Sequence, residues 1–310
     1  MTKLIMMIGL PASGKSTIAK NISKSIEANI HSSDELRLEM YGSYNVFDKN
    51  SELFNKLHKR ILNDLGNSIN VIYDATNLSL KKRRAFLATV PNNVFIEAIV
   101  VATDIHKCLM RDSNRKKIVG KNVILKMWEN FQFPLETEGF DNIEIKYTHD
   151  FEYRENLKNW NKCAHNFNQD NPHHSLNLYE HMLKAMANYG SNNSSCSEYY
   201  DTFKVEIYMA LVIHDIGKLW TKTFKNKKGI VTDVAHYYNH QNVSAYQSMF
   251  LFDRDEKKSY NLNYILQLIN YHMQPYSIST EKSKKKWLAI FGETLYKDLI
   301  EMNKYDQIGH

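Results

Sequence analysis

The stretch that decides the fold is Gly9-Leu10-Pro11-Ala12-Ser13-Gly14-Lys15-Ser16, close to the start of the chain. It has the Gly-x-x-x-x-Gly-Lys-Ser spacing of a phosphate-binding P-loop, and it lies between a strand pattern at residues 4–8 and a helical pattern at 16–26. Glycines let backbone N–H groups turn towards phosphate oxygens, and the N-terminus of the following helix attracts an anion. We therefore expect a site for ATP or another NTP, with Lys15 at the terminal phosphates and Ser16 on Mg²⁺. A chance glycine-containing turn is the alternative.

Around this loop, strand patterns at residues 4–8, 71–73, 94–102 and 143–147 alternate with helical patterns at 16–26, 54–63 and 79–88. This alternation predicts an α/β P-loop domain, in which a parallel sheet is flanked by helices. After about residue 150 strand patterns nearly vanish, and helical patterns follow at 176–189, 203–213, 241–252, 262–272 and 288–305. The sequence thus predicts two domains, residues 1–150 and an all-α domain at residues 151–310.

The composition narrows the setting. A chain of 310 residues with 43% hydrophobic residues has enough material for two packed cores. The net charge of +6 fits a polyanionic partner such as nucleic acid, and it fits an ordinary soluble protein equally well. Cys108, Cys163 and Cys196 form no Cys-x-x-Cys pair, which argues against a disulfide framework and a cysteine zinc site. The apolar run at the N-terminus is short, so we expect a cytoplasmic protein without a membrane span.

Three further motifs in the first half could complete a phosphotransferase site. Asp34, three residues before Arg37, could accept the proton of an attacking hydroxyl, or it could cap a helix beside a solvated arginine. Asp74 ends an apolar strand, as magnesium-associated carboxylates do, or it belongs to an ordinary turn. Arg111 and Arg115 are four residues apart, share a helix face and could close over the phosphates, unless that face is only solvated.

The order P-loop, Asp-x-x-Arg, Asp-x-Thr-Asn and Arg-x-x-x-Arg resembles the polynucleotide 5′-kinase family, over roughly residues 1–135. The resemblance implies Asp34 as general base, Arg37 as a contact to the acceptor phosphate and Arg115, with Arg111, as lid arginines. Ala12 departs from the family, which often has Gly there. Lys15, Asp34, Arg37 and Arg115 are the predicted catalytic residues of this half, and Lys218 is the predicted catalytic residue of the second half. The predicted nucleotide site consists of Gly9, Pro11, Ala12, Ser13, Gly14, Lys15, Ser16, Thr17, Asp74, Asn77, Arg111 and Arg115.

The second half contains histidines and aspartates beside helical patterns. They are His181, the run His214-Asp215-Ile216-Gly217-Lys218, the pair His236 and His240, and His272. Imidazoles and carboxylates gathered at helix ends are typical ligands of Mn, Fe, Ni, Co and similar divalent metals. A single such histidine is more often a core residue, but several in one small helical domain favour a metal site.

This half resembles the HD phosphohydrolase superfamily, over about residues 170–310. The resemblance implies one metal held by His181, His214, Asp215 and Asp306, and a second held by His240 and His272 with Asp215 bridging. The metal would be Mn, Ni, Co, Fe or Zn, and it would generate a hydroxide that attacks phosphorus. Lys218 would stabilise the phosphate charge. His236 and His174 are additional candidates, His174 as a substrate-facing residue.

Together the halves predict an enzyme that heals RNA or DNA ends. The kinase would phosphorylate a 5′-hydroxyl, and the HD domain would remove a 2′,3′-cyclic phosphate or a 3′-phosphate. The expected partners are polynucleotide ends and a separate ligase, in the cytoplasm (the host's, for a phage protein), with a homo-oligomer left open. Lys81-Lys82-Arg83-Arg84 would follow the phosphate backbone or simply be solvated. The alternatives are a small-molecule or nucleoside kinase fused to a nucleotidase, and a kinase with a non-catalytic HD sensing domain.

Overall fold

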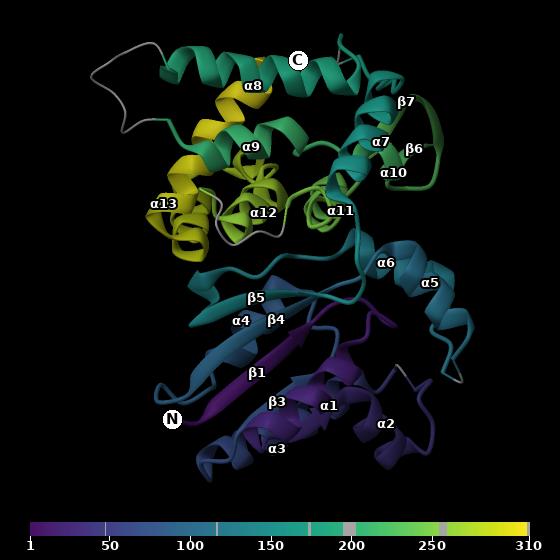
Figure 1. Cartoon of the computed structure of the whole chain (residues 1–310), viewed down its shortest axis with the longest axis vertical. Helices are drawn as coiled ribbons and strands as arrows, with labels where there is room; N and C mark the ends of the chain where they lie inside the picture. Colours follow the sequence, from purple (N-terminus) through teal and green to yellow (C-terminus); the bar gives the residue numbers. More distant parts are fainter. Residues whose placement is uncertain (47, 116, 173–174, 195–202, 254–258, 309–310) are drawn as a thin grey trace. The chain divides into compact units, whose positions relative to one another are not determined.

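The apolar run before the P-loop forms β1 (Lys3–Ile8), the central strand of a five-stranded sheet (Figure 1). The computed structural model describes residues 1–46, 48–115, 117–172, 175–194, 203–253 and 259–308. By its internal contacts the chain divides into two units, Met1–Asp150 and Phe151–His310.

The sheet of the first unit is parallel throughout, in the order β2-β3-β1-β4-β5. Its other strands are β2 (Asn29–Ser32), β3 (Val71–Asp74), β4 (Phe95–Ala102) and β5 (Asn142–Tyr147). The helices are α1 (Lys15–Ile26), α2 (Ser33–Tyr41), α3 (Asn50–Gly66), α4 (Leu80–Leu87), α5 (Ile105–Ser113), α6 (Lys121–Glu129) and the 3₁₀ helix η1 (Glu136–Glu138).

The five residues from Leu4 to Ile8 are all buried, so β1 is covered on both faces of the sheet. Ile5 and Met7 pack with Ala19 of α1 and Ile99 of β4 in one apolar cluster. Parallel strands buried on both faces are apolar throughout, which is the pattern that residues 4–8 show. The carboxyl ends of β1 and of its neighbour β3 place the P-loop and Asp74 at the same edge of the sheet, where parallel α/β folds bind ligands.

The second unit is largely helical. Its helices are α7 (Tyr153–His165), α8 (Leu178–Ser194), α9 (Val205–Ile213), α10 (Lys218–Thr221), α11 (His240–Ser248), α12 (Leu262–Tyr271), the 3₁₀ helix η2 (Pro275–Ser277) and α13 (Glu281–Ile308). The apolar helix α9 contacts α8, α12 and α13. The predicted fold class, an α/β P-loop domain followed by a helical domain, is confirmed.

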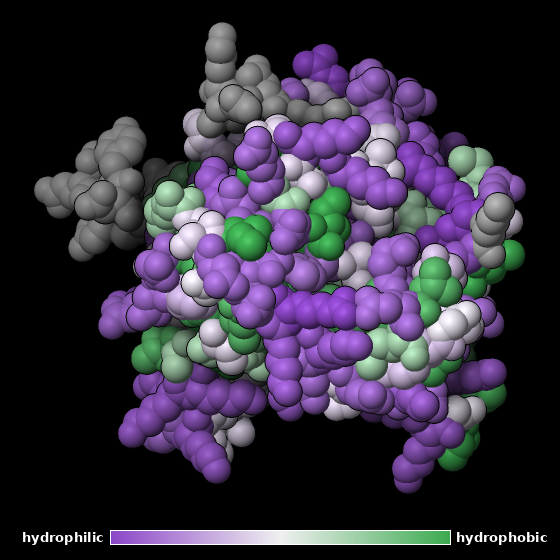
Figure 2. Space-filling model, turned by 90° about the horizontal axis from the view of Figure 1, so that it is seen from below, coloured by the Kyte–Doolittle hydropathy of each residue, from purple (hydrophilic) through white to green (hydrophobic). Residues whose placement is uncertain are grey.

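One feature of the second unit was not predicted: β6 (Lys222–Lys225) and β7 (Val231–Tyr237) form an antiparallel hairpin. Among the described residues, no helix has the length and apolar character that a membrane span requires. The face seen in Figure 2 is largely hydrophilic, with hydrophobic residues scattered over it. Cys108 and Cys163 are free thiols, and Cys196 lies outside the described residues.

Candidate functional site

The P-loop connects β1 to α1, and the backbone of its central residues is unusual. Ala12 and Gly14 both adopt a left-handed conformation, with φ of 60° and 97°. Gly9 lies against Val101 of β4, and the hydroxyl of Thr103 donates a hydrogen bond to the carbonyl oxygen of Ser13 at 2.7 Å. The loop is therefore fixed from the side of β4, with its open side at the sheet edge.

Lys15 is the buried cation of this loop. Its Nζ donates to the carbonyl oxygen of Leu10 at 2.6 Å, so the ammonium is held by the loop itself. Burial lowers the pKa of Lys15, an effect that the nearby Asp74 carboxylate opposes. The same ammonium also donates to the Ser13 hydroxyl at 3.5 Å. Exchange of these loop contacts for phosphate oxygens is the role expected of a P-loop lysine.

Ser16 and Asp74 lie together at the mouth of the loop. The Ser16 hydroxyl donates to Asp74 Oδ2 at 2.7 Å, and burial raises the pKa of Asp74. A hydroxyl and a carboxylate oxygen beside a phosphate cradle are the hard oxygen ligands that Mg²⁺ takes, usually together with water and phosphate oxygens. These residues therefore fit a magnesium ion that bridges to a bound nucleotide.

Asp34 lies in the first turn of α2, one residue after Ser33, and its carboxylate has two basic partners. Arg37 donates to Asp34 Oδ1 at 3.0 Å, and the Lys117 ammonium pairs with Oδ2. Arg37 is buried and also donates to the carbonyl oxygen of Val46 and, at 2.9 Å, to Asn50 Oδ1. Arg37 thus positions Asp34 on α2. The pairing of Lys117 with Asp34 was missed, because no spacing rule connects residues 83 apart.

One cavity of about 1770 Å³ joins these elements. Its lining includes Asp34 of α2. Aromatic side chains of α3, β3 and α4 also line it, namely Phe54, His58, Tyr73 and Phe86. Gly9 and Ser13 of the predicted nucleotide site lie outside the lining, whereas the following predicted residues line it: Pro11, Ala12, Gly14, Lys15, Ser16, Thr17, Asp34, Arg37, Asp74, Asn77, Arg111 and Arg115.

The arginines at 111 and 115 do not share a helix face, contrary to expectation. Helix α5 ends at Ser113, because the Asp112 carboxylate accepts hydrogen bonds from the N–H groups of Val119 and Gly120 and so turns the chain. Arg115 Nε donates to Asp112 at 2.8 Å, and Arg111 donates to Thr148 and to the Ser13 carbonyl. Both line the cavity, each held by the protein.

Asn77, which lines the cavity, and the basic run at residues 81–84 also have partners inside this unit. The Asn77 amide donates to the carbonyl oxygen of Met7 at 2.9 Å, so it braces the end of β1. Arg83 is neither solvated nor on a backbone-tracking surface: it is 1% exposed and makes two hydrogen bonds to Glu138, at 2.7 and 2.8 Å. Its charge is compensated inside the unit. Lys81 and Lys82 of the same run are exposed.

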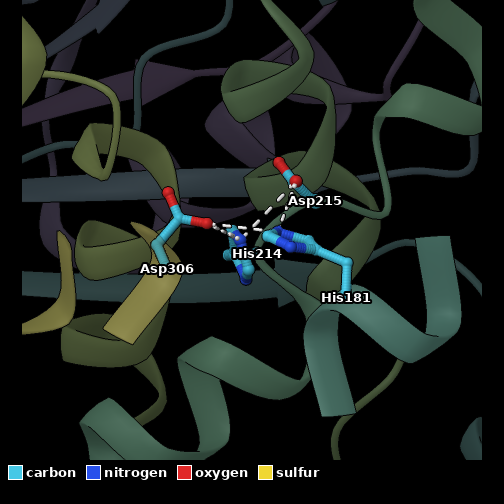
Figure 3. Close-up of side chains that lie close together, drawn as sticks. All are labelled: His181, His214, Asp215 and Asp306. Atoms are coloured by element: carbon cyan, nitrogen blue, oxygen red, sulfur yellow. Dashed lines mark hydrogen bonds and ion pairs between the residues drawn. The ribbon is translucent and has the colours of Figure 1, made fainter. Parts of the chain in front are cut away.

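In the second unit four predicted metal ligands converge (Figure 3). His181 comes from α8, His214 and Asp215 follow α9, and Asp306 lies near the end of α13. All four are buried, and their ligand atoms lie within 4.8 Å of one another. Asp306 Oδ1 is 3.0 Å from His214 Nε2 and 3.1 Å from His181 Nε2.

A second group shares Asp215. His240 Nε2 is 3.0 Å and His272 Nε2 is 3.5 Å from Asp215 Oδ1, whereas Oδ2 of the same carboxylate lies 3.3 Å from His181. The two oxygens of Asp215 therefore face different groups, as a bridging carboxylate between two metals would. We call the six residues His181, His214, Asp215, His240, His272 and Asp306 the His–Asp cluster.

Three histidines of the His–Asp cluster have their imidazole rings oriented by the same kind of backbone contact. In each, Nδ1 lies near the carbonyl oxygen three residues earlier: His214 to Leu211 at 3.0 Å, His240 to Tyr237 at 2.8 Å and His272 to Ile269 at 2.8 Å. A proton on Nδ1 leaves Nε2 as the free lone pair, and in all three rings Nε2 faces the cluster. Imidazole nitrogens with carboxylate oxygens suit divalent transition metals, so the donor set fits such an ion.

The charges of the cluster favour a cation in the same place. Burial opposes a proton on His181, yet hydrogen bonds and charges from Asp215 and Asp306 raise the pKa of His181 to about 9. Burial by itself would raise the pKa of Asp215, but the neighbouring cations, Lys218 first, hold it well below its usual range. In this structure Lys218 and the proton favoured on His181 balance the buried carboxylates, and a metal ion would replace that proton as a source of positive charge.

Around the cluster lie the predicted Lys218 and two residues that sequence reasoning missed, Gln169 and Tyr276. Lys218 Nζ pairs with Asp215 Oδ2 at 2.7 Å and donates to Gln169 Oε1 at 2.8 Å. The Tyr276 hydroxyl donates to Asp306 Oδ2 at 2.9 Å. Gln169 carries no motif signal, and Tyr276 is signalled only by closely following His272. His236, a further candidate, lies on β7, where it contacts Thr232 and stacks on Tyr238, whereas His174 lies outside the described residues.

Gly217 explains why the turn after His214 and Asp215 is tight. A Cβ at this position would lie 2.1 Å from the carbonyl oxygen of His240 and 2.7 Å from the Ser244 nitrogen. The Gly217 N–H donates to the Ser244 hydroxyl at 2.8 Å. This close approach brings α11, and with it His240, against Asp215.

One family model matches the first unit, and several solved structures resemble parts of the chain. Residues 4–134 match the protein family described as AAA domain, and no curated protein matches the chain. A chain of the Pnkp1/Rnl/Hen1 RNA repair complex is 24% identical with a TM-score of 0.40, and the match covers 45% of this chain and 46% of that one. A chain of the structure described as the Pnkp1/Rnl/Hen1 complex is also 24% identical, with a TM-score of 0.34 and coverage of 38% and 40%.

A gluconokinase from Sinorhizobium meliloti 1021 is 13% identical with a TM-score of 0.36, and the match covers 48% of this chain and 84% of that one. The present chain matches less than half the length of either Pnkp1/Rnl/Hen1 chain.

Proposed function

We propose that the first unit is an ATP-dependent kinase of 5′-hydroxyl ends and that the second is a metal-dependent phosphohydrolase of 3′ phosphate ends. The observation that carries the kinase proposal is the position of Asp34, which lines the same cavity as the P-loop and the Ser16–Asp74 pair. A proton acceptor, a phosphate cradle and a magnesium-type ligand pair in one cavity are the parts that phosphoryl transfer needs.

In the proposed kinase step, Asp34 accepts the proton of the acceptor hydroxyl as its oxygen attacks the γ-phosphorus and the bond to ADP breaks. Arg37 and Lys117 hold the Asp34 carboxylate in place. Lys15 leaves the Leu10 carbonyl and contacts the terminal phosphates. Magnesium, held by Ser16 and Asp74, would neutralise the negative charge that develops on the phosphate oxygens.

For the second unit, the proposal is supported by the buried His–Asp cluster and by the adjacent Lys218. A divalent metal bound there would lower the pKa of a water molecule to supply hydroxide. His240 and His272, with Asp215 between them, would hold a second ion. Lys218 lies beside Asp215, where its ammonium can bind a phosphate oxygen of the substrate. These parts suit hydrolysis of a 2′,3′-cyclic phosphate or a 3′-phosphate.

The two proposed activities act on complementary defects. Ligation needs a 5′-phosphate and a 3′-hydroxyl, whereas broken strands often end in 5′-hydroxyl and cyclic or terminal 3′-phosphate. A chain with both activities would prepare both ends of RNA or DNA for a separate ligase.

The kinase assay uses a 5′-hydroxyl oligonucleotide, γ-labelled ATP and Mg²⁺. We expect label transfer by the parent protein and a loss of at least about a hundredfold in Asp34→Asn, because general bases contribute about 10²–10⁴-fold. Glu35→Gln is the matched control, since Glu35 is the exposed neighbour of Asp34 on α2. Equal activity in Asp34→Asn and Glu35→Gln would exclude Asp34 as the base.

The hydrolase assay uses 2′,3′-cyclic phosphate and 3′-phosphate ends with Mn²⁺, Ni²⁺ or Co²⁺. His214→Ala and Asp215→Ala should abolish release, and the exposed Glu155→Gln should retain it. Hydrolysis by His214→Ala at the parental rate would show that the cluster is not the site. Metal analysis of the purified protein separates a catalytic centre from a sensing domain that has lost its metal.

A small acceptor is the second candidate for the kinase, because rings line part of the cavity. The ring centres of His58 and Phe86 are 4.3 Å apart and those of Tyr73 and Phe86 are 5.2 Å apart. This wall of the cavity offers a nucleoside base aromatic contacts, chiefly from His58, because Tyr73 and Phe86 are each 3% exposed. Free nucleosides offered in the same kinase assay distinguish the two. Transfer to nucleosides without transfer to oligonucleotides would replace the polynucleotide proposal.

A further inference from the structure

The β6–β7 hairpin is inserted in the sequence between residues of the His–Asp cluster and its surroundings. Asp215 and Lys218 precede it, and His240 follows it. Residues 220–238 contain four lysines and one aspartate, so this segment supplies +3 of the net charge of +6. Hydrophobic side chains are also exposed here: Trp220 (43%), Phe224 (41%), Ile230 (59%) and Val231 (69%). A basic surface with exposed rings beside a buried catalytic-type cluster suggests a bound polyanion.

Lysines and rings alternate from the hairpin to the cluster. The Lys222 ammonium lies 5.8 Å from the ring centre of Phe224 and 4.7 Å from that of Phe167. The ring centres of Phe167 and Tyr237 are 6.2 Å apart, and the Lys218 ammonium is 5.4 Å from the Tyr237 ring. Lys218 then contacts Asp215 of the cluster at 2.7 Å.

We propose that this row, Phe224, Lys222, Phe167, Tyr237 and Lys218, is a binding track for a single-stranded polynucleotide whose 3′ end enters the His–Asp cluster. The proposal rests on the proposed hydrolase function, and it assigns that site a strand rather than a free mononucleotide as its substrate. Rings stack with bases of any sequence, and ammonium groups bind phosphates, so the track would have little sequence preference.

The track is held in place by the protein. Lys222 pairs with Asp170 at 2.6 Å, and the Tyr237 hydroxyl donates to the carbonyl oxygen of Gln169. Gln169 is fully buried, and its side chain accepts from Lys218. Lys218 is the member of the row that contacts the cluster, and a strand of several nucleotides would also contact the members that follow it as far as Phe224.

The binding test uses the full chain in EDTA and a ten-nucleotide single strand, as RNA and as DNA, with a 3′-phosphate and a fluorescent dye blocking its 5′ end. Phe224→Ala should weaken binding about tenfold, because a base stacked on this ring loses its contact. Lys222→Ala should weaken binding and reduce the slope of log K against log salt by about 1. Phe203→Ala is the matched control, because Phe203 is a similarly exposed ring (37%) of the same unit, and Lys285→Ala is the exposed lysine control.

The activity test compares kcat/KM for the ten-nucleotide 2′,3′-cyclic phosphate substrate with kcat/KM for a cyclic mononucleotide. The ratio of the two should fall about tenfold in Phe224→Ala and stay at the parental value in Phe203→Ala. Parental affinity for RNA and DNA in both track variants would overturn the proposal, whether or not the protein hydrolyses either substrate. Loss of affinity in the track variants, with no hydrolysis by the parent, would uphold the track and reject the hydrolase function.

Discussion

At position 12 an alanine occupies a backbone conformation that favours glycine. Its φ of 60° places the Cβ close to the backbone, which costs a non-glycine residue about 1–2 kcal/mol. We expect Ala12→Gly to raise the free energy of unfolding of the first unit by up to about 1 kcal/mol, after the entropy cost of glycine. Ala12→Val should lower it, because a branched side chain tolerates this φ least. Urea unfolding measures both, and equal destabilisation by the two substitutions would contradict the expectation.

At position 217 the constraint is the space around the residue and not its backbone conformation, because neighbouring backbone atoms lie too close for any side chain. Gly217→Ala should destabilise the second unit by about 1–3 kcal/mol and weaken Mn²⁺ binding, because the new Cβ pushes against the backbone of His240 and Ser244. The control is Gly190→Ala on α8, where a Cβ would meet the Tyr208 ring at an ordinary 3.5 Å. That change should be neutral or slightly stabilising, because alanine favours a helix. Calorimetric Mn²⁺ titration and urea unfolding report the two effects.

His58 gives the first unit a pH dependence. Burial lowers its pKa from the ordinary value of 6.5, so below that value the unfolded chain binds a proton that the folded chain resists. Stability from this residue is therefore present above about pH 6.5 and is lost as the pH falls. His58→Gln should show a smaller loss of stability between pH 7.5 and 5.5 than the parent, by urea unfolding at the two pH values. If His58→Gln loses as much stability between pH 7.5 and 5.5 as the parent, other titratable groups cause the pH dependence.

At the scale of elements, α4 is fixed to η1 by a buried ion pair between Arg83 and Glu138. Arg83→Met removes the partner of Glu138 and leaves its carboxyl buried, which should cost about 3–5 kcal/mol. Arg84→Met, one residue along the helix and half-buried, should cost much less. Unfolding of the double variant Arg83→Met/Glu138→Leu should recover most of the loss, because no charge is then left buried. A double variant as unstable as the single one would show that shape, not charge, determines the effect.

The same ion pair shows where sequence patterns fail. Four consecutive basic residues at 81–84 predict a solvated or phosphate-binding surface, yet the partner that buries Arg83 is 55 residues away. The end of α5 depends likewise on the Asp112 carboxylate turning back to Val119 and Gly120. In contrast, β1, the P-loop and α1 are predictable because their signals are local: an apolar run, a fixed spacing and a helix start. The hairpin was not predicted because its strands are half-exposed and lack the continuous apolar run that marks β1 and β3.

For the whole molecule, we expect Mn²⁺ to stabilise the second unit and Mg²⁺-ATP to stabilise the first, each without effect on the other. The chain has four tryptophans, of which Trp128 lies in the first unit and the others in the second. In the Trp128→Phe variant, the remaining tryptophans all lie in the second unit, so fluorescence follows the unfolding of that unit. Mn²⁺ at about 100 times its Kd should raise the free energy of unfolding of this unit by about 2.7 kcal/mol. EDTA should reverse this shift, and Asp306→Asn should lack it. Mg²⁺-ATP should leave this signal unchanged; a shift by ATP alone would contradict separate sites.

The two sites also differ in how far the sequence predicts them. Fold class follows from strand and helix patterns and is confirmed. The nucleotide loop follows from spacing within eight residues. The His–Asp cluster draws its members from α8 to the end of α13, so from residues alone its convergence is only a hypothesis, and the resemblance to a family supplied the grouping. Lys117, Gln169 and Tyr276 belong to the surroundings of these sites through contacts that exist only after folding.

The hairpin has one further consequence, for how such a protein can change over generations. From Asn226 to Ile230 its tip is closed by hydrogen bonds of its own, and its two stems return the chain to fixed positions at Lys218 and His240. Insertions, deletions or exchanges in the tip therefore need not displace a single ligand of the cluster. Under the proposed function, selection would alter the strand contacts of the hairpin and leave the His–Asp cluster unchanged, and a designer would do the same by loop grafting.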